Sequence, residues 1–200
     1  MIKILAGYYF FVGLLIAKAN HLFSPADPGE DNLYIYRLLC VLTSICLSAY
    51  FHTILSKKWK KALVLVFCAF NCVYYLFNNV IGDGHKVFDS MAYVLLSSTL
   101  VVLIFIFMHQ LMTNVGEEPL SMNFDFWFSS SQLIYFLGSF LVFLTYGYLT
   151  KKAISSDGYR GYSQSLIWLW GVHNVLLFLS ALLTVGSIAW MSFHKKSSSF

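Results

Sequence analysis

Phe126–Leu149 reads FWFSSSQLIYFLGSFLVFLTYGYL, and this stretch decides the fold class. It contains 24 residues and no Asp, Glu, Lys or Arg. A helix in the core of a soluble protein needs only about 10–14 apolar residues, whereas a helix that crosses a bilayer needs about 20. The stretch therefore predicts a transmembrane helix that is surrounded by lipid.

The composition of the whole chain indicates the same environment. Of the 200 residues, 58% are hydrophobic and only 11% are charged, whereas a typical soluble domain carries about 25% charged residues. The charges gather in short segments between apolar runs, which is typical of a multi-pass membrane protein. The basic clusters Lys57–Lys61 and His194–Lys196 suit anionic headgroups at span ends. No segment is long enough to form a basic soluble domain, so we expect no nucleic-acid partner.

Apolar runs separated by short polar segments predict an all-α bundle of six transmembrane helices. We expect one transmembrane domain over residues 1–200, and strand alternation of the barrel type is lacking. If Lys57–Lys61 is a tight connection in the cytoplasm, as the positive-inside rule favours, both termini are cytoplasmic too. The predicted spans are about 2–22, 34–56, 62–81, 88–112, 126–149 and 164–193.

The first span has a second interpretation. Lys3, the apolar run that follows it and the sequence Ala17-Lys18-Ala19 also fit a signal peptide, whose cleavage would remove residues 1–19. We expect a retained span in which Lys18 extends to the interface, and cleavage stays the alternative.

Acidic residues are confined to predicted loops and helix ends. Proton- and sodium-coupled carriers usually hold a carboxylate deep in the membrane, and intramembrane hydrolases need buried acids or a cluster of metal ligands. The pattern argues against both classes, so we expect no enzyme activity. The nine acids are Asp27, Glu30, Asp31, Asp83, Asp89, Glu117, Glu118, Asp125 and Asp157.

Polar side chains inside the spans mark a candidate site. His173 and Asn174 lie in the sixth span, too deep to reach headgroups easily, so they should hydrogen-bond another helix. Asn78 and Asn79 in the third span lie at a similar predicted depth. Such contacts contribute about 0.6–2 kcal/mol each. We predict that they hold helices together, with a ligand pocket as the alternative.

The fifth span carries a second polar patch. Gln132 and Tyr135 lie beside Ser129–Ser131, and serine lets helices approach closely. His52 and His109 are each predicted about one turn from the cytoplasmic end of a span, so the two imidazoles could meet and hold haem or a metal. An interfacial hydrogen bond is the commoner role of a histidine there, so we expect no cofactor.

The four cysteines also lie inside apolar runs. Cys40, Cys46, Cys68 and Cys72 lack the spacing of a zinc site, and a disulfide framework would place them in loops. We predict free thiols that pack as small hydrophobic side chains.

Three stretches of the chain resemble, in this order, an uncharacterised family of bacterial multi-helix membrane proteins. They are NLYIYR (Asn32–Arg37), FWFSSSQLIYFLGSFLVF (Phe126–Phe143) and LIWLWGVHN (Leu166–Asn174). The family is common in the Bacteroidota lineage, typically has seven helices, and is similar to membrane modules found beside or within sensor kinases. The chain departs from the family pattern at Arg37 and Thr43, where a His and a Glu are usual. The family's first helix is also missing, so residues 1–23 match its second. The resemblance implies a sensory or accessory membrane role and no reaction.

These observations together predict a non-enzymatic sensory or accessory subunit of a bacterial cytoplasmic (inner) membrane. It would bind a partner membrane protein, such as a sensor kinase, or a small apolar ligand. Two alternatives stay open. One is a haem- or redox-cofactor-binding subunit that uses His52 and His109. The other is a carrier for a neutral or lipid-like substrate.

Overall fold

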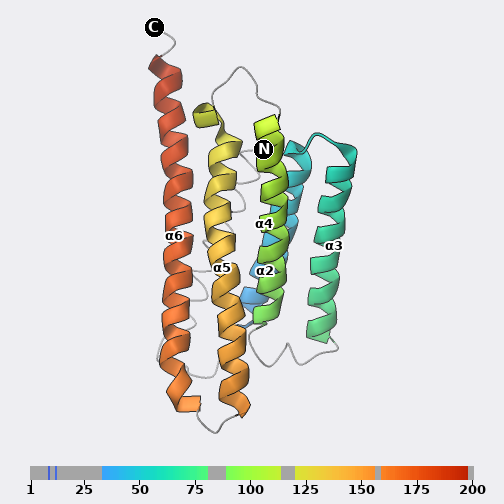
Figure 1. The fold of residues 1–200 in the computed structure, drawn as a ribbon, viewed down its shortest axis with the longest axis vertical. Helices are drawn as coiled ribbons and strands as arrows, with labels where there is room; N and C mark the ends of the chain where they lie inside the picture. Colours follow the sequence, from blue (N-terminus) through green and yellow to red (C-terminus); the bar gives the residue numbers. More distant parts are fainter. Residues whose placement is uncertain are drawn as a thin grey trace. The chain divides into compact units, whose positions relative to one another are not determined.

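The computed structural model describes Tyr9, Val12 and residues 33–80, 89–113, 120–155 and 159–197. Every regular element within these residues is helical, which confirms the all-α class (Figure 1). The elements are α2 (Leu33–Ile54), α3 (Lys58–Val80), α4 (Ser90–Thr113), the short 3-10 helix η2 (Leu120–Met122), α5 (Phe124–Ser155) and α6 (Tyr159–Ser197).

Five of these helices are long and apolar enough to cross a membrane. The predicted first span, about 2–22, lies outside the described residues except for Tyr9 and Val12. A sixth span and the cytoplasmic placement of both termini therefore stay predictions. The five candidate segments are Ile35–Ile54, Lys58–Asn78, Ser90–Thr113, Phe124–Lys152 and Gln164–Trp190.

The basic cluster Lys57–Lys61 is largely helical, so the prediction that it forms a connection was wrong. The helix α3 begins at Lys58, and only Leu55–Lys57 separates it from α2. The N–H of Lys61 donates to the carbonyl oxygen of Lys57 at 3.1 Å, which starts the helical hydrogen-bond pattern. Lysine is a good helix former, so the helix begins in the charged segment, before the apolar run.

The helices α5 and α6 also extend beyond their predicted spans. They contain 32 and 39 residues, which corresponds to about 48 and 58 Å at 1.5 Å per residue. The hydrocarbon core of a bilayer is only about 30 Å thick. Lys151 and Lys152 are exposed near the end of α5, where cations interact favourably with the helix dipole. Only residues 156–158 separate the two helices, fewer than the segment left between the predicted spans 126–149 and 164–193.

Side-chain caps fix the start of two helices. The carboxylate of Asp89 accepts a hydrogen bond from the N–H of Ala92 at 3.0 Å, in front of α4. The amide oxygen of Asn123 accepts one from the N–H of Phe126 at 3.1 Å, at the start of α5. These caps satisfy backbone donors that a helix leaves unpaired at its N-terminus.

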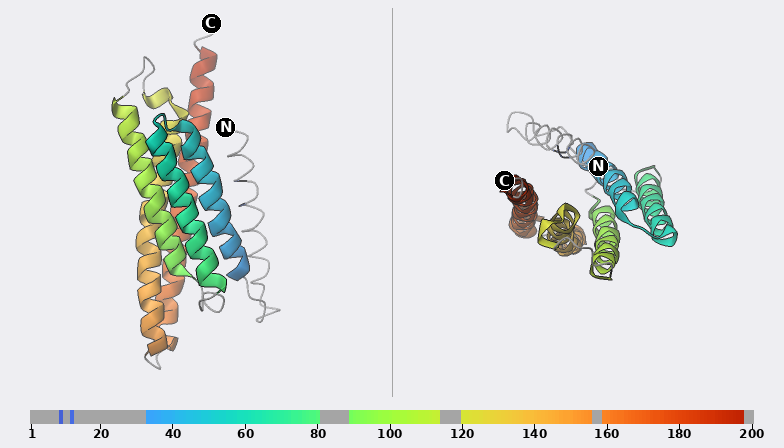
Figure 2. Two further views of the ribbon diagram at one scale, coloured as in Figure 1. Left: turned by 90° about the vertical axis from the view of Figure 1, so that its right-hand side faces the viewer. Right: turned by 90° about the horizontal axis from the view of Figure 1, so that it is seen from above.

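The chain divides into two compact units, Met1–Leu96 and Ser97–Phe200, with the boundary inside α4. In the first unit α2 packs against α3, and the hydroxyl of Tyr93 donates to the carbonyl oxygen of Tyr36 at 2.7 Å, which ties the start of α4 to α2. In the second unit α5 and α6 lie side by side along most of their length (Figure 2). A single transmembrane domain over residues 1–200 stays a prediction.

Candidate functional site

Buried polar side chains face each other along the contact between α5 and α6. The hydroxyl oxygens of Ser131 and Thr184 are 2.8 Å apart, and Nε2 of Gln132 donates to Oγ of Ser180 at 3.3 Å. All four side chains are buried. Lipid offers no hydrogen bonds, so polar pairs of this kind hold two transmembrane helices together. We call the whole set the polar seam, which consists of Ser131, Gln132, Tyr135, Ser139, His173, Ser180 and Thr184.

The helical period explains why these residues meet. Ser131, Tyr135 and Ser139 follow one another at intervals of four, which places them on one face of α5. Ser180 and Thr184 have the same spacing on α6. The site predicted from the sequence did not include Ser139, Ser180 and Thr184. The signal that could have found them is this four-residue spacing of hydroxyl side chains in two consecutive spans.

His173 occupies the seam towards the opposite end from Thr184. Its Nδ1 lies 3.2 Å from Oγ of Ser139, and its Nε2 lies 3.4 Å from the hydroxyl oxygen of Tyr135. A neutral imidazole has one N–H donor and one nitrogen acceptor, and a hydroxyl can take either role. Both ring nitrogens of His173 are therefore within reach of a suitable partner in either tautomer.

Three aromatic rings surround the imidazole of His173. The ring centroids of Phe143, Tyr135 and Trp170 lie 4.8, 5.4 and 5.5 Å from its own. Phe143 and Trp170 also contact each other in an edge-to-face arrangement at 5.9 Å. Together with the two hydroxyls, these rings leave His173 only 7% exposed. We call Tyr135, Phe143 and Trp170 the aromatic box.

The contact between Ser139 and His173 has the composition of a nucleophile and its general base. In hydrolases of that type a third group, usually a carboxylate, orients the histidine through its other nitrogen. Here the other nitrogen faces the hydroxyl of Tyr135. Ser139 is 1% exposed, so its hydroxyl is enclosed between the helices. The geometry is that of a packed helix contact and supports no acyl transfer.

A glycine brings the two helices close together in the middle of the seam. A Cβ atom placed on Gly138 would lie 2.5 Å from Cδ1 of Leu176, and real Cβ atoms essentially never approach another heavy atom so closely. Gly138 therefore provides the space that Leu176 fills. Close backbone approach of this kind strengthens packing between transmembrane helices.

The structure brings three of the six predicted site residues, Gln132, Tyr135 and His173, into the polar seam. Asn174 is exposed on α6. The side-chain amide of Asn78 donates to the carboxylate of Asp89, inside the first unit. Asn79 lies in α3, but its side chain is outside the described part of the chain.

The two histidines considered as haem ligands lie in different units, each described by itself. His52 is part of α2 and is partly exposed, and His109 is part of α4 and is exposed. The described residues contain no group of three or more His, Cys, Asp or Glu side chains that could hold a metal ion. Haem binding by His52 and His109 stays an untested hypothesis. All four cysteines are free thiols, as predicted.

Comparisons with protein-family models, curated proteins and solved structures give no match to this chain. The resemblance to a bacterial membrane-protein family therefore rests on the three sequence stretches alone. The features that bear on function are the polar seam and the surfaces around it.

Proposed function

We propose that the chain is a six-span protein of a bacterial cytoplasmic membrane, with both termini inside, and that it acts as a non-enzymatic sensory or accessory subunit. It would bind a partner membrane protein, such as a sensor kinase, or a small apolar ligand. The observation that carries this proposal is the enclosure of His173. The imidazole of His173 is the most reactive side chain in the seam, and both of its ring nitrogens make contacts that join α6 to α5.

The polar seam gives the α5–α6 contact one preferred register. The two helices are antiparallel along the seam. Ser131 of α5 contacts Thr184 of α6, and Ser139, further along α5, contacts His173, which comes before Thr184 in α6. A slip of one helical turn would separate all of these pairs at once and leave buried hydroxyls without partners, which is costly in lipid. We therefore expect α5 and α6 to move as one body. A bundle that responds to a partner in discrete steps needs such a body.

An apolar face of α6 is available to a partner or to lipid. Its exposed side chains include Val175, Phe178, Leu182 and Val185. Asn174 lies on the same exposed side of the helix, and an amide exposed to hydrocarbon is unfavourable. A partner helix with a hydrogen-bonding side chain at this depth would satisfy Asn174. A small apolar ligand would use the hydrophobic side chains alone.

Site-specific crosslinking in native membranes tests the proposal. A photoreactive residue at Phe178, which is 63% exposed, should crosslink to one membrane protein. The same residue at Phe143, which is 1% exposed, should give no crosslink between proteins. The Asn174→Leu variant should weaken the crosslink, and deletion of the chain should change the signalling output of the captured protein. A captured protein whose output is unchanged on deletion, or no capture in stoichiometric amount, would contradict the proposal.

A further inference from the structure

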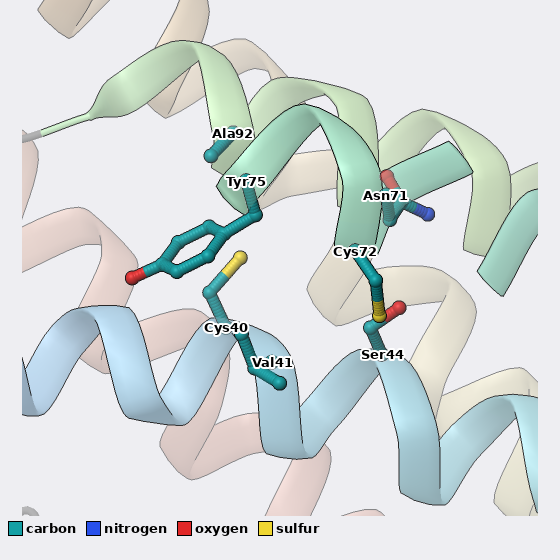
Figure 3. A pocket seen from close by; sticks show the side chains of 7 residues that line it. All are labelled: Cys40, Val41, Ser44, Asn71, Cys72, Tyr75 and Ala92. Atoms are coloured by element: carbon teal, nitrogen blue, oxygen red, sulfur yellow. The ribbon is translucent and has the colours of Figure 1, made fainter. Parts of the chain in front are cut away.

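A small cavity lies between α2, α3 and the start of α4, inside the first unit (Figure 3). The volume open to the centre of a water molecule is about 10 Å³, which is about the least that a single water needs. Most of the lining surface is apolar, but five of the seven lining residues have a polar or sulfur-containing side chain. The residues are Cys40, Val41 and Ser44 from α2, Asn71, Cys72 and Tyr75 from α3, and Ala92 from α4.

The hydroxyl of Ser44 needs a partner at this cavity. Ser44 is only 3% exposed, and its Oγ has no hydrogen-bond partner within the described part of the chain. Figure 3 shows its side chain pointing from α2 towards Cys72 of α3. The buried hydroxyl of Thr184 in α6, by contrast, donates to the carbonyl oxygen of Ser180 at 3.0 Å. A buried hydroxyl without a partner is unfavourable, because it loses its hydrogen bonds to water and gains none.

The chemistry and size of the cavity select its occupant. A buried water needs space for one molecule and two to four polar partners. The hydroxyl of Ser44 supplies one partner, and the thiols of Cys40 and Cys72, which are weak donors and acceptors, lie beside the same space (Figure 3). The volume is too small for a larger ligand.

We propose that this cavity is a binding site for a single water molecule, which hydrogen-bonds the hydroxyl of Ser44 and bridges α2 to α3. The bridge lies beside a direct link between the same helices, because the thiol of Cys68 donates to the carbonyl oxygen of Ser44 at 4.0 Å. The polar seam joins α5 to α6 through direct contacts between side chains, whereas the α2–α3 contact includes an exchangeable molecule. The inference does not depend on a sensory or accessory role.

Water-edited solid-state NMR in lipid bilayers tests the site directly. Protein labelled with ¹³C-serine should show early transfer of magnetisation from water to Cβ of Ser44. Ser48 is the control, because it is buried one turn further along α2 and does not line the cavity. The Ala92→Ser variant adds one heavy atom of about the size of a water molecule to the lining, so it should abolish the early transfer to Ser44. Equal transfer to Ser44 and Ser48, no transfer to Ser44, or a signal unchanged by Ala92→Ser would each overturn the proposal.

Thermal unfolding of the Ser44→Ala variant gives an independent test, because a hydrated and a dry cavity predict different changes in Tm. If water occupies the site, the substitution removes one of its hydrogen bonds and lowers Tm. If the cavity is dry, the substitution removes an unsatisfied hydroxyl and raises Tm or leaves it unchanged. An unchanged or higher Tm would therefore overturn the proposal. The crosslinking experiment on α6 would be unaffected by either result.

Discussion

Oγ of Ser139 lies 3.2 Å from Nδ1 of His173, so a buried imidazole joins two helices that follow each other in the chain. Its Nε2 faces the hydroxyl of Tyr135, which also comes from α5. One side chain of α6 is thus held between two side chains of α5 that are four residues apart. Interhelical hydrogen bonds in membranes are individually modest, so packing in the aromatic box should contribute at least as much as the two hydrogen bonds.

Substitutions at His173 separate these two contributions. His173→Phe keeps a ring against Phe143 and Trp170 but removes the hydrogen bonds, so we expect the free energy of unfolding to fall by about 1 kcal/mol. His173→Ala also removes the ring and leaves a cavity, so we expect a loss of about 3 kcal/mol. Both values can be measured by denaturant titration in detergent micelles. Equal losses for the two variants would show that ring packing contributes nothing.

The contact between Ser131 and Thr184 can be measured with a double-mutant cycle. Ser131→Ala and Thr184→Val each remove one hydroxyl, and we expect a coupling of about 0.6 kcal/mol, with about 1.7 kcal/mol as an upper bound. Ser130 provides the matched control. Its hydroxyl donates to the carbonyl oxygen of Phe126 in its own helix at 2.8 Å, as that of Ser131 does to Phe128, but only Ser131 also contacts the hydroxyl of Thr184 among the described hydrogen bonds. Ser130→Ala should show no coupling to Thr184→Val. A coupling as large as that of Ser131 would contradict a direct contact.

The helical class and five membrane-length segments could be predicted because the length of an apolar run is a local property of the sequence. Helix ends were harder to predict. A span predicted from hydropathy ends at the first charged residues, whereas the hydrogen-bonded helix continues for as long as the residues are good helix formers. That difference placed Lys58 in a connection instead of in α3, and it ended the fifth span at Leu149 instead of Ser155.

The partners within the candidate site could be predicted only in part. Depth in the membrane indicated that His173 should hydrogen-bond another helix, but depth alone cannot choose among helices. The choice follows from the short connection after Ser155, which makes α5 and α6 neighbours, and from Gly138, which lets them approach. Neither feature is visible from hydropathy. The cavity at Ser44 was not predicted, because it depends on how two helix surfaces fit.

The cap of α4 gives a prediction for the first unit. Asp89→Ala removes the oxygen that accepts the N–H of Ala92 and should lower the free energy of unfolding by about 0.5–2 kcal/mol. Asp89→Asn keeps an oxygen for the N–H of Ala92 and should cost little, provided that Asn78, which donates to the other oxygen of Asp89, turns its own amide oxygen towards the new NH2 group. Amide exchange at Ala92 should become faster in the alanine variant and stay near the wild-type rate in the asparagine variant. Fast exchange in both variants would indicate that the negative charge matters more than the cap.

Gly138 gives the sharpest prediction for the second unit. Alanine normally stabilises a helix relative to glycine by about 1 kcal/mol, and Gly171→Ala should do so, because nothing lies within 4 Å of the added Cβ atom. At Gly138 the added atom would meet Cδ1 of Leu176 at 2.5 Å. Leu176 must then change its rotamer or the helices must separate, so we expect Gly138→Ala to lose about 1–2 kcal/mol despite the better helix propensity.

The double variant Gly138→Ala, Leu176→Ala decides whether that loss comes from the clash. Removing the Leu176 side chain leaves space for the new methyl group, so the two substitutions should cost less together than the sum of their separate effects. Thermal unfolding of the four proteins in one detergent measures the difference, with Gly171→Ala as the reference for propensity alone. If Gly138→Ala stabilises the chain as much as Gly171→Ala does, then α5 and α6 are not held as closely as the geometry at Leu176 requires.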